Sequence, residues 1–129
     1  PDRDSALEHF RHKKAFARWD PQVLADYIDH GMHEEEGKWV LGFDRDVETA
    51  IYNTLPDNLD RLLRRHPLKC PVAFIGGTHS AEMQQVGMAM TEKLVKGRQM
   101  MLDGSHLFPM EKPMATAAAI EAALLNLQA

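Results

Sequence analysis

The sequence predicts an α/β fold, chiefly because two short apolar runs are separated by a helical pattern. Residues 71–77 form a continuous apolar run that does not alternate and ends in two glycines, as is typical of a parallel strand buried on both faces. Residues 100–102 form a second buried run. Between the two runs, apolar residues recur at helical spacing, at Met83, Val86, Met90 and Leu94. This order predicts a right-handed parallel strand–helix–strand crossover.

The first half of the chain is predicted to be helical, and we expect no strong strand within residues 1–67. Residues 5–19 have the spacing of a weakly amphipathic helix. Asp20 is suited to an N-cap and Pro21 to the first helical position, so a second helix is expected to start there. Gly31 is suited to the end of that second helix.

Further along this half, polar segments are expected to separate shorter elements. The EEEGK run at 34–38 is predicted to be a solvated loop, and residues 39–41 a short extended segment. Asp46 and Asp57 are each suited to cap a helix, and Pro67 is expected to stop the second of these helices. We therefore divide the chain into a helical region, 1–67, and a strand-helix-strand-helix region, 68–129.

The last helix should cover the predicted sheet. We expect Gly97 to end the helix between the strands, and the inner face of the final helix to be formed by Ala117, Ile120, Leu124 and Leu127. Two parallel strands are not stable alone, because parallel sheets normally contain several strands with helices on both faces. We expect the remaining strands to come from another chain or from residues that precede Pro1.

Composition narrows the class of protein. The 129 residues suffice for one domain with a modest core, and the formal net charge of −4 argues against a general binder of nucleic acids or anionic membranes. A single cysteine, Cys70, excludes an intrachain disulfide and fits a reducing, cytoplasmic location. No apolar run reaches the roughly 18 residues that a membrane span needs.

The second predicted strand leads into the segment with the clearest chemical signal. It ends in Asp103-Gly104, and His106 follows at once on a loop before the final helix. A catalytic base needs such a position, because it must be fixed and yet reachable. Glu111 comes shortly before Pro113 and the helix, a position that suits a negative charge near a helix N-terminus.

The order of these pieces resembles the C-terminal portion of the α/β-hydrolase fold. The resemblance is carried by PVAFIGG as the penultimate strand, MMLDG as the last strand and GSHLFPMEKP before the final helix. The segments FARWDPQVLADYIDHGM and ETAIY are similar to the helical cap of esterase- or lipase-like members. In that family, the loop after the last strand commonly carries the triad histidine as G-x-H followed by E-x-P, which here are residues 104–106 and 111–113. The resemblance implies that Glu111 braces the loop around His106 or caps the final helix.

The resemblance implies a hydrolase that acts on an ester or related bond of a small, apolar substrate. His106 would be its general base, residues 1–67 its cap, and no cofactor or metal is implied. The same fold also carries epoxide hydrolases, dehalogenases and carbon–carbon hydrolases. A non-catalytic interaction module that docks by an exposed strand edge is the alternative from a different class.

The sequence departs from the family pattern at two points. The nucleophile elbow G-x-S-x-G is absent, and none of the three serines (Ser5, Ser80 and Ser105) lies in such a turn. Ser80 also occupies the position where the triad aspartate is expected. Either Glu82 stands in as the acid, or the acid and the nucleophile belong to a part of the fold outside this chain, such as a second polypeptide. The chain alone would then be inactive.

Other polar residues have simpler interpretations. His30 and His33 are followed by glutamates, but Gly31 interrupts the helix that would have to present both imidazoles, so an exposed charged loop is favoured over a metal site. His79 and Ser80 either face the active site or are ordinary turn residues; both interpretations stay open.

Overall fold

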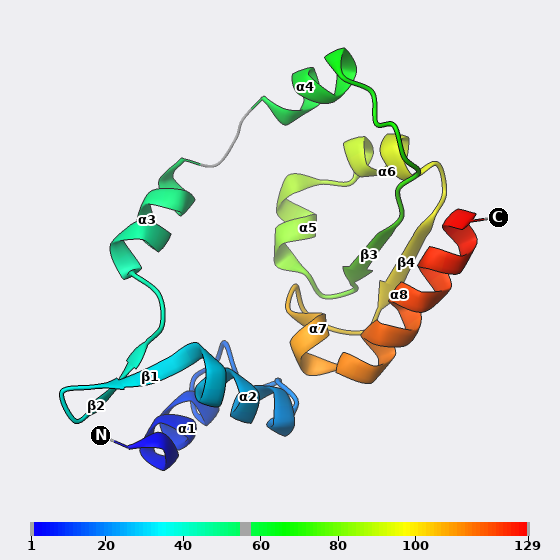
Figure 1. Cartoon of the computed structure of the whole chain (residues 1–129). Coiled ribbons are helices and arrows are strands. Elements are labelled where there is room, and N and C mark those ends of the chain that lie inside the picture. Colours follow the sequence, from blue (N-terminus) through cyan, green and yellow to red (C-terminus); the bar gives the residue numbers. More distant parts are fainter. Residues whose placement is uncertain (1, 55–57, 129) are drawn as a thin grey trace. The chain divides into compact units, whose positions relative to one another are not determined.

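The computed structural model describes residues 2–54 and 58–128 and confirms the α/β class. The chain divides into two compact units, the second of which begins at Asn58. Among the described residues each unit contains one two-stranded sheet, antiparallel in the first and parallel in the second (Figure 1). Among the same residues, no helix is both long enough and apolar enough to cross a membrane.

Two helices open the first unit. Helix α1 spans Arg3–Arg11, which is shorter than the predicted 5–19, and α2 spans Pro21–Gly31. The prediction for the start of α2 is confirmed, because the Asp20 carboxylate accepts hydrogen bonds from the backbone N–H groups of Gln22 and Val23. Between the helices the chain continues in turns rather than as one long helix.

Aromatic packing explains these turns. Successive backbone bonds of turn type join Phe10, Lys13, Phe16 and Trp19. They bring Phe10, Phe16 and Trp19 onto Tyr27 of α2, with ring centroids 4.7–5.8 Å apart. A continuous helix would carry these rings away from α2. The aromatic contacts therefore stabilise the turns more than further helical hydrogen bonds would stabilise a longer helix. The buried core of this unit is completed by Leu24 and Ile28.

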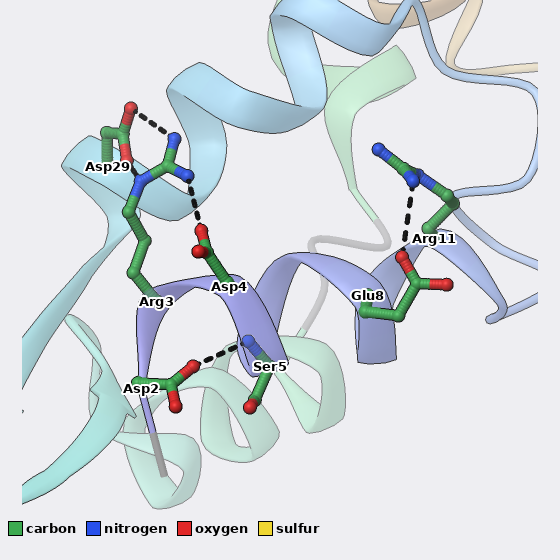
Figure 2. Close-up of polar contacts among 7 residues, drawn as sticks. All are labelled: Asp2, Arg3, Asp4, Ser5, Glu8, Arg11 and Asp29. Atoms are coloured by element: carbon green, nitrogen blue, oxygen red, sulfur yellow. Dashed lines mark hydrogen bonds and ion pairs between the residues drawn. The ribbon is translucent and has the colours of Figure 1, made fainter.

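Arg3 ties the start of α1 to the end of α2, as Figure 2 shows. Its guanidinium forms a two-pronged contact with Asp29, in which one N–O distance is 2.9 Å, and also contacts Asp4 at 3.2 Å. The hydrogen bond from Arg3 lowers the pKa of Asp29. Because both side chains remain more than a third exposed, water and salt screen the attraction between Arg3 and Asp29.

A hairpin follows α2, so the expectation of no strong strand within residues 1–67 was wrong. Strand β1, Met32–Glu35, pairs antiparallel with β2, Lys38–Leu41. The connecting residues Glu36 and Gly37 both have positive φ, +50° and +73°, as a tight primed hairpin turn requires. The supposed loop at 34–38 is therefore the tip of the hairpin, and the extended segment 39–41 is part of its second strand.

Two short helices come next. Helix α3 spans Arg45–Asn53 and is capped by Asp44, whose carboxylate accepts from two backbone N–H groups; Asp46, the predicted cap, instead lies in the first turn. Helix α4 spans Leu59–Arg65 and ends before Pro67, as predicted. Its predicted cap, Asp57, lies outside the described residues.

The second unit contains the predicted parallel pair. Strand β3, Phe74–Gly77, pairs in parallel with β4, Gln99–Leu102, which confirms both strands and their direction. The single helix predicted between them is in fact two, α5 at Ala81–Val86 and α6 at Ala89–Val95. Gly87 separates them with φ +80° and ψ 168°, a conformation that is open to glycine and that breaks the helix.

Two helices close the chain. Helix α7, Phe108–Glu111, is one turn that the sequence pattern did not reveal, and α8, Pro113–Gln128, lies against α7 and β4 (Figure 1). The buried side chains of α8 are Thr116, Ala119 and Ala123.

The predicted inner face of α8 was wrong, with the exception of Leu127, which is partly buried. Ala117 is exposed, and Ile120 and Leu124 are 47% and 56% exposed. The helix is apolar on every side, so its periodicity does not single out a face. Small side chains at the contact let the helix lie close to its neighbours.

Candidate functional site

The loops that follow β3 and β4 lie against each other at the carboxyl ends of the two strands. The backbone N–H of Thr78 donates to the carbonyl of Leu102 at 2.8 Å, and that of His79 donates to the carbonyl of Gly104 at 2.9 Å. The pairing of the strands is thereby extended into the loops. This edge of a parallel sheet is where α/β folds usually hold their ligands.

Gly77 permits this close approach. A Cβ atom at Gly77 would overlap the carbonyl oxygen of Ser105 and lie 2.6 Å from that of Gly104. Gly104 is similarly enclosed, because a Cβ there would lie 2.7 Å from the Cβ of Phe108. The two glycines therefore set the position of the histidine loop relative to β3.

His106 meets Ser80 across the two loops. The distance from Ser80 Oγ to His106 Nδ1 is 3.2 Å. Ser80 is 2% exposed, whereas 58% of the His106 side-chain surface is accessible. One nitrogen of an otherwise reachable imidazole is therefore held by a buried hydroxyl. The structure thus places Ser80 against His106.

Glu82 contacts the same hydroxyl. Ser80 Oγ donates to Glu82 Oε2 at 3.2 Å, while the Glu82 oxygen lies 3.8 Å from His106 Nδ1, too far for a direct hydrogen bond. The pKa of Glu82 is lowered, mainly by its own backbone N–H at the start of α5, and less by the Ser80 hydroxyl and the charge of His106. The Ser80 hydroxyl therefore links Glu82 to His106 through hydrogen bonds.

Ser80 also begins helix α5. Its Oγ accepts from the backbone N–H of Met83 at 3.2 Å, in the usual manner of a serine N-cap. The hydroxyl is enclosed and already engaged, so it is not placed to attack a substrate. Sequence reasoning did not connect Ser80 to His106, although its place at the expected aspartate position was the available signal.

Glu111 holds the histidine loop, the segment around His106, through hydrogen bonds with Ser105. Its carboxylate accepts from the backbone N–H of Ser105 at 3.1 Å and from the Ser105 hydroxyl, and Ser105 Oγ in turn accepts from the N–H of Leu107 at 3.0 Å. The bracing role that the sequence suggested for Glu111 fits this geometry.

We expect Glu111→Ala to lower the free energy of unfolding by about 1–2 kcal/mol, because two donors on Ser105 lose a charged acceptor. Glu111→Gln should cost less, because an amide oxygen still accepts a hydrogen bond. Urea unfolding measures both variants. Equal stability of Glu111→Ala and the unmodified chain would contradict the bracing role.

His79 belongs to a separate set of contacts. Its Nδ1 lies 3.1 Å from Thr78 Oγ1 and 3.4 Å from Asp103 Oδ1, and Asp103 also pairs with Lys112. These side chains are largely exposed. His79 therefore contacts Asp103, whereas Ser80 contacts His106.

Other candidate features do not converge on this site. The described residues hold no group of three or more histidine, cysteine or acidic side chains placed to bind a metal ion. His30 lies in α2 and His33 in β1, so one helix does not present both imidazoles.

A cavity of about 500 Å³ lies at the amino-terminal ends of β3 and β4, away from His106. Its lining residues include Leu63, Cys70 and Arg98.

Comparison with known proteins supports the fold. No protein-family model and no curated protein matches the chain. Among solved structures, a thioesterase domain from the curacin biosynthetic pathway matches with a TM-score of 0.69 and 17% sequence identity. The match covers 96% of this chain and 44% of that chain, so this chain spans less than half the length of that domain. The chain therefore has part of an α/β-hydrolase-like fold.

Proposed function

We propose that this chain supplies the general base of a hydrolase that uses a nucleophile–histidine–acid triad, and that His106 is that base. The observation that carries the proposal is the contact of His106 Nδ1 with buried Ser80 at the carboxyl edge of the sheet. Nδ1 is the nitrogen that a triad histidine turns toward its orienting group. Within the described part of the chain, His106 Nε2 has no hydrogen-bond partner, and more than half of the side-chain surface is open.

The chemistry that this arrangement fits is acyl transfer. Nε2 takes the proton of a nucleophilic hydroxyl or thiol as that group attacks the carbonyl carbon, and the imidazolium then protonates the leaving group. A water molecule, deprotonated in the same way, cleaves the acyl intermediate and frees the nucleophile. The similarity to a thioesterase domain makes a small apolar thioester or ester the first substrate class to test.

The nucleophile is proposed to lie outside these 129 residues. Ser80 is buried, Ser105 is bonded to Glu111, and Ser5 lies in the first turn of α1 in the other unit. The rest of the sheet, with the nucleophile and the oxyanion donors, would come from a second polypeptide or from further residues of a longer chain. The match to less than half of a thioesterase domain supports this arrangement.

Helix α8 offers a surface for that missing part. Its exposed apolar side chains are Met114, Ile120, Leu124 and Leu125, which are 47–81% exposed. Burial of such a surface against further helices or strands would stabilise the unit. The same surface suits the alternative function, a non-catalytic module that binds a partner, and the histidine variant described in the Discussion separates the two.

The acid of the triad and the cap complete the proposal. Glu82 is linked to His106 by hydrogen bonds only through the Ser80 hydroxyl, so either this relay orients the imidazole or a carboxylate outside the chain reaches it. Residues 1–67 are proposed to be the cap region of the fold.

The isolated chain is expected to show no hydrolysis of p-nitrophenyl esters or acyl thioesters above the buffer rate, because it lacks the nucleophile. After addition of the nucleophile-bearing part, a serine-directed phosphonate should label that part and not this chain, as read by intact mass. Hydrolysis by the 129 residues alone would overturn the claim that the nucleophile lies elsewhere.

A further inference from the structure

We infer that Ser80 is a positioning residue that holds neutral His106 in the tautomer with its proton on Nδ1. The inference concerns how the imidazole is prepared, and its catalytic meaning rests on the proposed function. The tautomer itself is a property of this chain and is measurable without any activity.

The argument begins with the donors and acceptors around one buried oxygen. A serine hydroxyl carries a single proton and accepts about two hydrogen bonds. Ser80 Oγ has three neighbours at 3.2 Å, which are the Met83 backbone N–H, Glu82 Oε2 and His106 Nδ1. The Met83 N–H is always a donor, so it occupies one acceptor position of the oxygen.

The carboxylate decides where the serine proton goes. Glu82 has a lowered pKa and is ionised near neutral pH, and an ionised carboxylate accepts but does not donate. The Ser80 proton must therefore point to Glu82, since otherwise two acceptor oxygens would face each other. The only role left for His106 Nδ1 is that of a donor. Every donor and acceptor position of Ser80 is then satisfied.

The burial of the Ser80 hydroxyl supports this assignment. Ser80 is 2% exposed, so water has little access to complete an alternative pattern. The opposite tautomer would leave the lone pair of Nδ1 facing the lone pairs of Ser80 Oγ. An imidazole protonated at Nδ1 has its lone pair on Nε2, which is the form that a general base needs. The hydroxyl thus makes the orienting hydrogen bond that a carboxylate usually makes, while the Glu82 carboxylate stays 3.8 Å from Nδ1.

The experiment is a multiple-bond ¹H–¹⁵N correlation spectrum of the ¹⁵N-labelled chain, recorded at a pH where the histidines are neutral. The spectrum of His106→Ala identifies the His106 signals among the seven histidines. We expect the nitrogen shifts of His106 to show Nδ1–H as the main tautomer. A main Nε2–H tautomer in the unmodified chain would overturn the inference.

Two variants test the cause. Ser80→Ala should shift the tautomer ratio toward Nε2–H by about tenfold, the effect of one net hydrogen bond, and Ser80→Thr should restore it. Because Ser80→Ala also removes the cap of α5, Glu82→Ala provides an independent test. It keeps the cap and frees the Ser80 proton to donate to Nδ1, so it too should shift the ratio toward Nε2–H.

Glu92→Ala is the matched control, since Glu92 lies in the first turn of α6 as Glu82 does in that of α5. Its ratio should equal that of the unmodified chain. An unchanged ratio in a folded Ser80→Ala or in Glu82→Ala would overturn the inference. If the tautomer is as inferred but His106→Ala leaves hydrolysis by the complete protein intact, the proposed function fails while the inference stands.

Discussion

Replacement of His106 by alanine is expected to reduce kcat by about 10⁴- to 10⁶-fold in a protein that combines this chain with the nucleophile-bearing part of the fold. The reason is that attack and departure of the leaving group both depend on proton transfer at Nε2. Without the imidazole, the nucleophile keeps its proton, and the residual rate comes from substrate binding and the oxyanion donors alone. Steady-state hydrolysis of a thioester and an ester measures the loss.

The matched control is His66→Ala. His66 is exposed at the end of α4, and it has no place in the site. We expect full activity from this variant. Assembly of the two parts should be unchanged in both variants, as measured by sedimentation. If His106→Ala assembles and keeps its activity, the chain is an interaction module rather than the source of a catalytic base.

Gly77→Ala is expected to have the largest effect on stability and to cost about 3 kcal/mol, at the upper end of the range for overpacked sites. The new methyl group would overlap the backbone carbonyl of Ser105, which is held in turn by the bond from Ser105 N–H to Glu111. Backbone has no alternative rotamer to adopt, so the histidine loop must move away from β3. We also expect the contact between His106 and Ser80 to be lost.

Gly76→Ala is the paired control on the same strand. Its added Cβ would lie 2.7 Å from the Met83 Sδ and from a ring carbon of Phe74, which are side-chain atoms rather than backbone. The flexible methionine can move aside, so the expected cost is about 1 kcal/mol. Urea unfolding compares the two variants. If Gly77→Ala and Gly76→Ala lower the free energy of unfolding equally, the close approach of the histidine loop is not the reason that position 77 requires glycine.

Local signals in the sequence were sufficient where one residue acts on its own backbone. Asp20 caps α2 with Pro21 behind it because a carboxylate and a fixed φ act within a single turn. The two strands of the second unit were visible because an apolar run closed by glycines has few other solutions. Gly97 likewise marked the end of the helical stretch before β4, where its φ is +85°.

Local signals failed where two patterns compete. Asp44 and Asp46 are both plausible caps, and the first of them starts α3. The acidic run at 34–38 looked like a loop because charged residues dominate it, yet its Glu36-Gly37 pair turns the chain into a hairpin whose backbone bonds outweigh its poor strand propensity. In α8, apolar residues on every side hid the buried face until its contact with β4 was known.

The candidate site shows the same division. The sequence by itself placed His106 on the loop after the last strand, because the apolar run, Asp103-Gly104 and the following prolines are all local features. The resemblance to the α/β-hydrolase pattern also pointed to Ser80, as the residue at the position where that pattern has an aspartate. Only the tertiary structure decided that Ser80 Oγ meets His106 Nδ1, since 26 residues separate them and parallel pairing of β3 with β4 is what brings their loops together.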